Sequence, residues 1–521
     1  MKYNKYYPLI EKANKKFLSY LEKIKDIKDF DKKNNALKSL LEFSVYHNAG
    51  IWASAFVEKF YTDWAKSIDI DNYDIAFKKN SFLHVMTTGY STGGHTRVVE
   101  RWISNAPEIQ NHSVVILSPN DAKMSVLENN VKFKKGKCFY FDNSLSEKDK
   151  ALKLRKLALN YEYIILHTHM EDVIPLIAFG TEKFTRPVLL YNHASLMFWI
   201  GKSISDLVLD IVNEDEITKS KRNIKNTFFL GVPSKEIVYS TPDKKELRKK
   251  LGIPVDKKII ISSGSIQKYC IINNDSYADI IKKLIDENTY CYIIGIPKDD
   301  KYWKKIEQET MGHIVPLGYV DFNNGYLDYL SCADLYIDSY PMTGGTTMID
   351  VISRGVAAIS LKTVDIQLDY FSSSSAYCND KSEFILKGKK ILNDKKYAKK
   401  IIDELQQSLE KYQSVIEWNK RIYKMLEKVP KTHSIKTFSF EKEISVIDDL
   451  SVLLNIMTDK NAFNRKSVLK QILRQSFNDF IKFGVNYRSK GIPFIFEILS
   501  FKKGNKKSRV IKILGINVFV Y

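Results

Sequence analysis

The stretch ADLYIDSYPMTGGTTMIDVISRGVAAISL, residues 333–361, carries the strongest information about the fold. Its apolar run LYI ends at Asp338 and predicts a buried strand, after which comes a loop with Pro341, Gly344 and Gly345. A helix is expected from about Thr346, and the run VAAISL predicts a second strand. Two strands joined by a crossover helix are a unit of a parallel sheet.

The same alternation of strand and helix extends along most of the chain. The strand candidates in this half are KIIISSGS, YCYIIGI and HIVPLGYV, and those in the first half are FLHVMT, SVVILS, YIILH, PVLLY and DLVLDI. A Pro- and charge-rich segment separates the two sets, which predicts two doubly wound α/β domains that face each other across a cleft. We expect the domains at 81–235 and 250–380, a helical N-terminal region at 1–80, helices returning to the domain interface at 381–430, and a basic amphipathic tail at 431–521.

Length and composition limit the class of protein. The chain has 521 residues, of which 44% are hydrophobic and 27% charged, as expected of a soluble globular protein. No apolar run reaches the roughly eighteen residues of a membrane span, and the N-terminus lacks the pattern of a signal peptide. We therefore expect a cytoplasmic protein. The five cysteines show no CxxC spacing, which argues against a disulfide framework or a structural zinc site.

The formal net charge of +20 favours polyanionic partners. No motif for binding RNA or DNA is recognisable, so a nucleic-acid partner is not expected. Residues 460–521 combine basic clusters with apolar residues, and we expect them to contact an anionic membrane surface on its cytoplasmic side. The alternative is that this tail packs on the second domain and that its charge is only solvated.

The loop after Asp338 is the candidate donor site. In open α/β sheets, ligands bind beyond the carboxyl ends of the strands, and a helix start offers unpaired N–H groups to a diphosphate. Gly344 and Gly345 allow close approach of the backbone, while the hydroxyl groups that follow add donors. An ordinary capped helix after a glycine turn would have the same pattern, so the letters alone leave both interpretations open.

This segment resembles the nucleotide-binding half of GT-B glycosyltransferases, in particular the O-linked N-acetylglucosamine transferase group and its bacterial relatives. That group carries Gly-x-Thr-Thr-x-x-Asp, and this chain reads Gly344-Gly345-Thr346-Thr347-Met348-Ile349-Asp350. The resemblance implies that Thr346 and Thr347 contact phosphate and that Asp350 contacts ribose. The chain departs from the group at Gly345, where the relatives often carry His or another polar residue.

Two more donor contacts follow from the resemblance. Lys268, in SSGSIQKY, occupies the place from which GT-B enzymes commonly supply a cation to the diphosphate. Such a cation would neutralise the departing nucleotide without a metal ion. Tyr319 lies where the family recognises the base and is expected to stack on uracil. The alternatives are a solvated lysine and an ordinary strand end.

The first domain is expected to hold the acceptor and the catalytic base. Its loop TTGYSTGGHTR contains Gly93 and Gly94, which by resemblance border the transferred sugar. His95 follows at a helix start, where a similarly placed His recurs in the resembling group. A neutral imidazole there can take the proton of an acceptor hydroxyl, a contribution of typically about 10²–10⁴-fold in rate. Arg97 is a candidate anion contact or a helix-surface charge.

Other histidines follow predicted strands in the same domain, and they complete the set of candidate catalytic residues. His167 and His169 lie in LHTHMED, and His193 lies in YNHAS, a stretch that looks like one found in bacterial polysaccharide glycosyltransferases. His193 is expected to contact the sugar or a phosphate, and His169 is a further catalytic candidate. The alternative, a satisfied core histidine, is open for His193 and is favoured for His167. The pair Asp69 and Asp71 lies outside any strand end, so no metal site is expected.

The sequence therefore predicts a metal-independent hexosyl- or N-acetylhexosaminyl-transferase. It is expected to move a sugar from a nucleoside diphosphate, a UDP-sugar, to a glycan or lipid-linked glycan in bacterial surface polysaccharide assembly, with no cofactor besides this co-substrate. One alternative is a protein O- or N-glycosyltransferase. A second is a nucleotide-sugar epimerase of the same fold, which would need carboxylates in the cleft.

Overall fold

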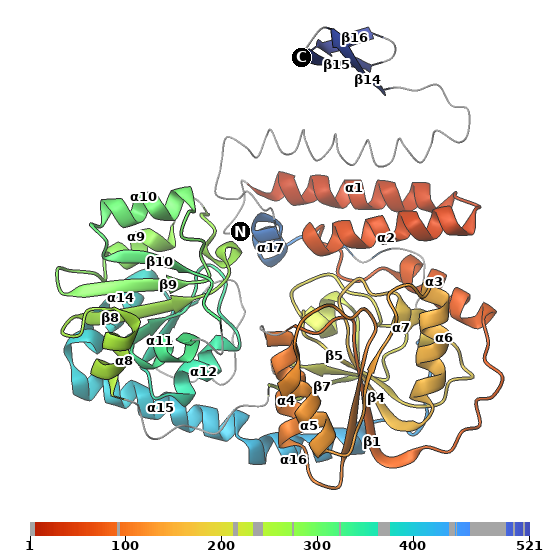
Figure 1. Cartoon of the computed structure of the whole chain (residues 1–521), viewed down its shortest axis with the longest axis horizontal. Coiled ribbons are helices and arrows are strands. Elements are labelled where there is room, and N and C mark those ends of the chain that lie inside the picture. The colour runs from red at the N-terminus through yellow and green to blue at the C-terminus, as the bar shows by residue number, and fades with distance from the viewer. Residues whose placement is uncertain are drawn as a thin grey trace. The chain divides into compact units, whose positions relative to one another are not determined.

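The structure of the chain is a computed structural model (Figure 1). Two compact units make up the chain, Met1–Lys460 and Asn461–Tyr521, and each is described by itself. The residues described are 6–90, 94–211, 217–232, 243–272, 276–321, 325–362, 376–436, 443, 445–458, 496–503, 506–513 and 516–520.

The first domain of the larger unit contains a seven-stranded parallel sheet with the order β3-β2-β1-β4-β5-β6-β7 (Figure 1). The sequence moves outward in both directions from the neighbours β1 and β4, which is the arrangement of a doubly wound domain. The strands are β1 (Lys78–Met86), β2 (Asn111–Ile116), β3 (Cys138–Tyr140), β4 (Tyr161–His167), β5 (Val188–Tyr191), β6 (Leu207–Asp210) and β7 (Thr227–Phe229).

Helices cover both faces of this sheet. On one face lie α4 (Gly94–Asn105) and α5 (Ser125–Phe133), whose Val99 and Leu127 pack with Val114 of β2. On the other face lie α6 (Glu147–Ala158) and α7 (Ile174–Phe179), in one apolar core with Val115. Because both faces are buried, β1, β2, β4, β5 and β6 read as nearly continuous apolar runs, and this is why their positions could be predicted. The edge strands β3 and β7 are only partly buried and were not predicted.

The predicted N-terminal helical region is confirmed, and it is part of the first domain's core. It consists of α1 (Tyr7–Lys25), α2 (Phe30–Tyr46) and α3 (Ala55–Ser67). Phe17, Leu37 and Val57, one from each helix, belong to the same apolar cluster as the sheet residues Leu83 and Leu166. The region therefore stabilises the sheet directly.

Glu58 of α3 supports a loop of the first domain beyond β5. Its side chain is buried, and its two carboxylate oxygens accept the N–H groups of Gly201, Lys202 and Ser203 at 2.7, 3.0 and 3.0 Å. The hydroxyl of Ser203 donates to the same carboxylate. Burial raises the pKa of Glu58, and these hydrogen bonds oppose the rise.

We expect Glu58→Gln to lower the free energy of unfolding by about 1–3 kcal/mol, because the amide turns one acceptor into a donor that faces N–H groups. Urea unfolding measures the change. Glu42→Gln, on the exposed side of α2, is the matched control and should alter stability by no more than about 0.5 kcal/mol. Equal midpoints for Glu58→Gln and the control would contradict the role of Glu58 in holding the loop.

The second domain contains a six-stranded parallel sheet with the order β10-β9-β8-β11-β12-β13. Together with the first sheet it confirms the predicted pair of Rossmann-like α/β domains. Its strands are β8 (Lys258–Ser263), β9 (Thr289–Ile294), β10 (Ile314–Gly318), β11 (Leu335–Ile337), β12 (Ala358–Leu361) and β13 (Tyr377–Cys378). Its helices are α8 (Lys244–Leu251), α9 (Tyr277–Lys282), α10 (Lys301–Glu309), α11 (Leu327–Ser331), α12 (Thr347–Ser353) and α14 (Lys381–Asn393).

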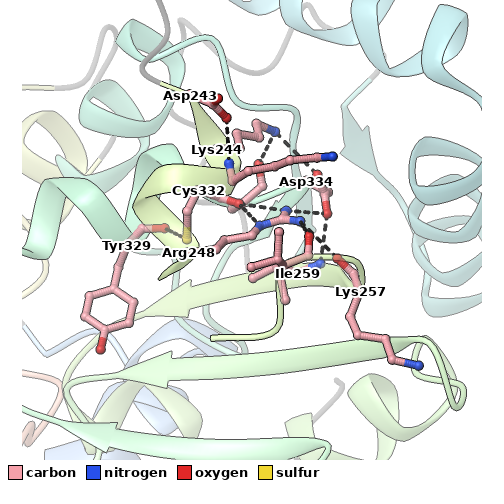
Figure 2. A network of polar contacts seen from close by, with 11 residues as sticks. Asp243, Lys244, Arg248, Lys257, Ile259, Tyr329, Cys332 and Asp334 are labelled. Atoms are coloured by element: carbon pink, nitrogen blue, oxygen red, sulfur yellow. Dashed lines mark hydrogen bonds and ion pairs between the residues drawn. The ribbon is translucent and has the colours of Figure 1, made fainter. Parts of the chain in front are cut away.

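A buried arginine joins α8 to this sheet (Figure 2). The guanidinium of Arg248 donates to the carbonyl oxygens of Cys332, Val255 and Lys257, and it forms an ion pair of 2.7 Å with Asp334. Asp334 also accepts the N–H of Ile259, the second residue of β8, at 2.9 Å. These contacts hold α8 and the start of β8 together, and all of them join residues of the second domain.

Two long helices continue from the second domain and contact the first. They are α15 (Lys395–Gln413) and α16 (Val415–Lys428). Trp418 of α16 packs edge-on against Trp102 of α4, with ring centroids 5.6 Å apart, and Arg421 donates to the carbonyl of Leu230 at 2.9 Å. These contacts involve large buried side chains, so α16 is part of the first domain's packing.

The predicted basic tail does not form one continuous segment. His433 and Lys436 bind Asp206 of the first domain, and α17 (Asp449–Thr458) packs near α1, so the chain up to Thr458 belongs to the larger unit. Residues 467–484, which are part of the predicted amphipathic tail, lie outside the described residues. The smaller unit contains three antiparallel strands that the sequence did not predict, β14 (Phe496–Lys503), β15 (Lys506–Ile513) and β16 (Ile516–Val520).

Candidate active site

Asp338 organises the candidate donor loop at the carboxyl end of β11. Its Oδ1 accepts the N–H groups of Ser339 and Gly344 at 2.9 and 2.7 Å, and Ser360 of β12 donates to its Oδ2 at 3.1 Å. A Cβ atom at position 344 would lie 2.6 Å from Oδ1 of Asp338, so only glycine fits there. The position of Asp338 at the strand end was predicted from the sequence, but its role in holding the loop was not. An acidic residue at the end of a buried strand was the pattern that could have indicated this role.

Lys268 lies beside this loop, as the sequence predicted, but it is not a solvated lysine. It belongs to η3 (Ile266–Tyr269), a short 3₁₀-helix beyond β8, and its Nζ donates to the carbonyl of Thr343 at 2.8 Å. Burial lowers the pKa of Lys268, and the charge of Asp338 opposes this. Burial raises the pKa of Asp338 to about 6, opposed by the charge of Lys268. A cation and a fixed loop are thus in contact.

The threonines of the motif lie where the resemblance puts them, at the start of α12. Thr346 is the N-cap residue, its side chain makes no capping hydrogen bond, and Thr347 begins the helix. Thr347 is within 3.5 Å of the hydroxyl of Tyr326. Gly345 has φ +64°, a left-handed conformation that favours glycine and accounts for the departure from the family's polar residue. Contact with phosphate stays a prediction.

Asp350 has a partner that the sequence did not reveal. Its Oδ1 accepts from Nη2 of Arg101 at 2.8 Å, and Arg101 lies on α4 of the first domain. The two side chains are buried, with exposed fractions of 8% for Arg101 and 12% for Asp350. An ion pair therefore joins the two domains at the residue predicted to bind ribose. No sequence signal pairs residues that lie so far apart along the chain, and ribose binding by Asp350 stays a prediction.

The two domains also approach each other at Gly94. A Cβ atom there would lie 3.4 Å from Oγ1 of Thr346, so the start of α4 is close to the donor loop. Gly93 lies outside the described residues. Arg97 forms an ion pair of 2.6 Å with Glu100 on the same helix, so its guanidinium already has a carboxylate partner. Tyr319 follows β10 and is 72% exposed, and its stacking on a base stays a prediction.

The three candidate catalytic histidines lie together. His95 is in the first turn of α4, and its ring centroid is 4.4 Å from that of His193, which follows β5, and 6.0 Å from that of His169, which follows β4. Burial lowers the pKa of His95 to about 4, with a smaller contribution from His169. Both ring nitrogens of His95 are buried and have no hydrogen-bond partner of ordinary geometry among the described residues, while a contact with the backbone of His167 opposes the lowering of its pKa.

The loop that carries His169 is held in place by hydrogen bonds to residues that follow β1 and β4. The N–H of His169 donates to the hydroxyl of Thr87 at 2.8 Å, and that hydroxyl in turn donates to the buried carboxyl group of Asp172. The hydroxyl of Tyr90 lies 3.3 Å from Nε2 of His169. Burial raises the pKa of Asp172, and its hydrogen bonds to Thr87 and Ile174 oppose this.

Behind the cluster runs a buried chain of histidines. Nε2 of His193 lies 2.8 Å from Nδ1 of His167, Nε2 of His167 lies 3.0 Å from Nδ1 of His84, and Nε2 of His84 lies 2.9 Å from Nδ1 of His112. His167 is a core histidine, as expected, but His84 and His112 were not singled out. The signal for His84 was a polar ring inside the otherwise apolar predicted strand FLHVMT, and His112 comes directly before the predicted strand SVVILS.

No side chains suited to a metal site and no membrane span are found in the part of the chain that the structure describes. No group of three or more His, Cys, Asp or Glu side chains there could hold a metal ion. None of the helices there combines the length and hydropathy that crossing a bilayer requires. Independence of a metal ion stays a prediction.

Solved structures resemble the chain, although no protein-family model and no curated protein sequence matches it. HepE (Alr3699) of Anabaena in complex with UDP and glucose aligns with a TM-score of 0.51 and 13% identity, over 67% of this chain and 99% of HepE. A glycosyltransferase from Rickettsia africae aligns with a TM-score of 0.51 and 12% identity, over 67% and 99%. At this identity the likeness shows the fold alone: the chain has the two-domain GT-B fold.

Proposed function

We propose that the chain is a glycosyltransferase that moves a sugar from a nucleoside diphosphate, a UDP-sugar, to a hydroxyl group of a glycan or lipid-linked glycan acceptor. One observation carries the proposal: the loop of the second domain, with the half-buried Lys268 bound to it, lies next to the histidine cluster of the first domain at Gly94 and Thr346. A cation for a diphosphate and a group of proton acceptors are what such a transfer requires. The similar HepE structures contain UDP, UDP with glucose, or UDP-glucose.

Each part of the site has a role in this reaction. The acceptor oxygen bonds to the anomeric carbon, the bond from that carbon to the diphosphate oxygen breaks, and its electron pair leaves with the diphosphate. The acceptor's proton passes to a neutral histidine of the cluster. Lys268 balances the negative charge that develops on the diphosphate, so that neither a metal ion nor a further cofactor is required. Thr346, Thr347 and Gly344 contact the phosphates, and Asp350 contacts the ribose.

The experiment that tests the proposal is donor binding by the purified protein. A panel of UDP-, GDP-, CMP- and dTDP-sugars is tested for thermal stabilisation. At a hundred times its dissociation constant, the UDP-sugar should stabilise the protein by about 2.7 kcal/mol. We expect Asp350→Ala and Lys268→Met to lose most of this stabilisation, since each removes a proposed donor contact.

Asp63→Ala is the control, because Asp63 is an exposed residue of α3 whose partner is Lys59 on the same helix. It should bind the donor like wild type. Absence of stabilisation of the wild type by every sugar nucleotide would contradict the donor site. Stabilisation that is unchanged in Asp350→Ala and Lys268→Met would contradict the assignment of these residues.

We also propose that residues 460–521 bring the protein to an anionic membrane surface, where a lipid-linked acceptor would lie. In this segment basic residues far outnumber the two acidic ones, Asp479 and Glu497. Each Lys or Arg near an anionic surface contributes about 1 kcal/mol. We expect the full chain to sediment with phosphatidylcholine vesicles that contain phosphatidylserine, and to be released by salt. Equal binding to vesicles of pure phosphatidylcholine would contradict an electrostatic contact.

A further inference from the structure

The hydrogen bonds along the buried histidine chain all run in one direction, and Gln110, at the end farthest from His193, sets that direction. Nε2 of His112 lies 3.2 Å from Oε1 of Gln110, a carbonyl oxygen that can only accept a hydrogen bond. His112, His84 and His167 are fully buried, at 0% exposure, and both ring nitrogens of each are engaged in the chain. Every ring along the chain is therefore constrained by its neighbour.

The rings are neutral, because burial holds the pKa of each well below the ordinary value for histidine. The pKa of His84 is lowered to about 3 by burial. Burial is also the largest cause for His112, His167 and His193, whose pKa values are further lowered by neighbouring histidines. A neutral imidazole carries one proton, so one nitrogen donates and the other accepts.

The tautomers then follow one after another. Since Nε2 of His112 donates to Gln110, its Nδ1 must accept from Nε2 of His84. Nδ1 of His84 accepts from Nε2 of His167, and Nδ1 of His167 accepts from Nε2 of His193. His193 consequently holds its proton on Nε2, and its Nδ1 carries a lone pair. The ring of His193 is half-buried beside His95, whose own nitrogens have no partner of ordinary geometry among the described residues.

Large side chains hold the rings of the chain in place. Trp102 of α4 packs edge-on against His84 and His167, with centroids 5.2 and 5.8 Å apart, and Phe82 stacks on His112 at 4.8 Å. Trp102 is itself fully buried. Rotation of a ring in the chain would break its hydrogen bonds and disturb this packing, so the order of donors and acceptors is maintained by geometry.

We propose that Gln110, His112, His84 and His167 are positioning residues, which hold His193 as the Nε2–H tautomer so that its Nδ1 takes the proton of the acceptor hydroxyl. This inference rests on the proposed function and names His193 as its base. When Nδ1 binds the proton, Nε2–H still donates to His167, so the imidazolium forms without rearrangement of the chain. In the other tautomer, the lone pair of His193 would face His167 and could not reach a substrate.

The tautomer can be measured directly on the full chain. Histidine labelled with ¹⁵N distinguishes a protonated from an unprotonated ring nitrogen by its chemical shift, and His193→Gln identifies the signal of His193 among the nine histidines. At pH 7.5 we expect His193 to be a single Nε2–H tautomer. The measurement needs no sugar donor, so it tests the order of hydrogen bonds along the histidines whether or not the donor-binding experiment succeeds. The Nδ1–H tautomer, or a mixture, in the wild type would overturn the proposal.

A variant at the far end tests the coupling. Gln110→Met removes the acceptor that sets the direction, and we expect His193 to become a mixture of tautomers. With the sugar donor, kcat should fall about tenfold or more while KM for the donor stays within about threefold, because the wrong tautomer affects proton transfer and not binding. Gln308→Met, on the exposed side of α10, is the matched control and should resemble wild type. An unchanged tautomer or an unchanged kcat in Gln110→Met would overturn the positioning role.

Discussion

Acidification from pH 7 to pH 5 should lower the free energy of unfolding by about 2 kcal/mol through His84, and further through His112 and His167. All three rings are fully buried and their pKa values are depressed, chiefly by burial. The folded protein therefore disfavours protonation of all three rings and keeps His84 neutral at pH 5, while the unfolded chain binds a proton at each once the pH falls below about 6.5. His84, whose folded-state pKa is about 3, contributes about 2 kcal/mol of this loss.

The sign follows from proton linkage. A histidine with a depressed pKa in the folded state contributes stability that is complete above the unfolded value and is lost as the pH falls toward the folded value. Asp338 acts in the opposite direction, because its pKa is raised to about 6 and the folded state binds its proton more readily. Its contribution over the same range is about 1 kcal/mol, which is smaller than the loss through His84.

Urea unfolding at pH 7, 6 and 5 measures the effect. The variant His84→Phe keeps an aromatic ring of similar size and removes one titrating group, so its stability should change by about 2 kcal/mol less than that of the wild type between pH 7 and pH 5. It is expected to be less stable at pH 7, since two hydrogen bonds of the chain are lost. Stability that is independent of pH in the wild type, or the same dependence in His84→Phe, would show that the rings are not buried and neutral.

Replacement of His193 by Ala should lower kcat by about 10²–10⁴-fold, with little change in KM for the donor. The reason is that Nδ1 of His193 carries the lone pair proposed to take the proton, whereas the proposed donor contacts are all in the second domain. Steady-state rates with the UDP-sugar found in the binding experiment measure this. Imidazole added to the buffer should restore part of the rate of His193→Ala.

His95→Ala separates the two candidates for the base. The family resemblance favours His95 as the base, and the structure brings the ring centroids of His95 and His193 to 4.4 Å. If His193 is the base, His95→Ala should retain more of kcat than His193→Ala and raise KM for the acceptor. A larger loss of kcat in His95→Ala would return the base to His95. His313→Ala is the control, because His313 precedes β10, away from the loops at the carboxyl ends of the strands.

The sequence by itself determined the two α/β domains, the N-terminal helices and the position of the donor loop. An apolar run such as LYI of β11 indicates a strand that is buried on both faces. The glycines at 344 and 345 indicate a backbone that is closely approached or that takes a conformation favoured by glycine. The grouping of His95, His169 and His193 could also be predicted, because the carboxyl ends of parallel strands meet at one edge of a sheet.

Only the tertiary structure decided which side chains pair. The ion pair of Arg101 with Asp350, the role of Asp338 in holding the donor loop, and the order of His112, His84 and His167 all join residues of different elements. Hydrogen bonds and ion pairs depend on distances of about 3 Å and on direction, which register and packing set after the strands assemble. Hydrophobic burial is non-directional and leaves a periodic pattern in the sequence, whereas these pairings leave none.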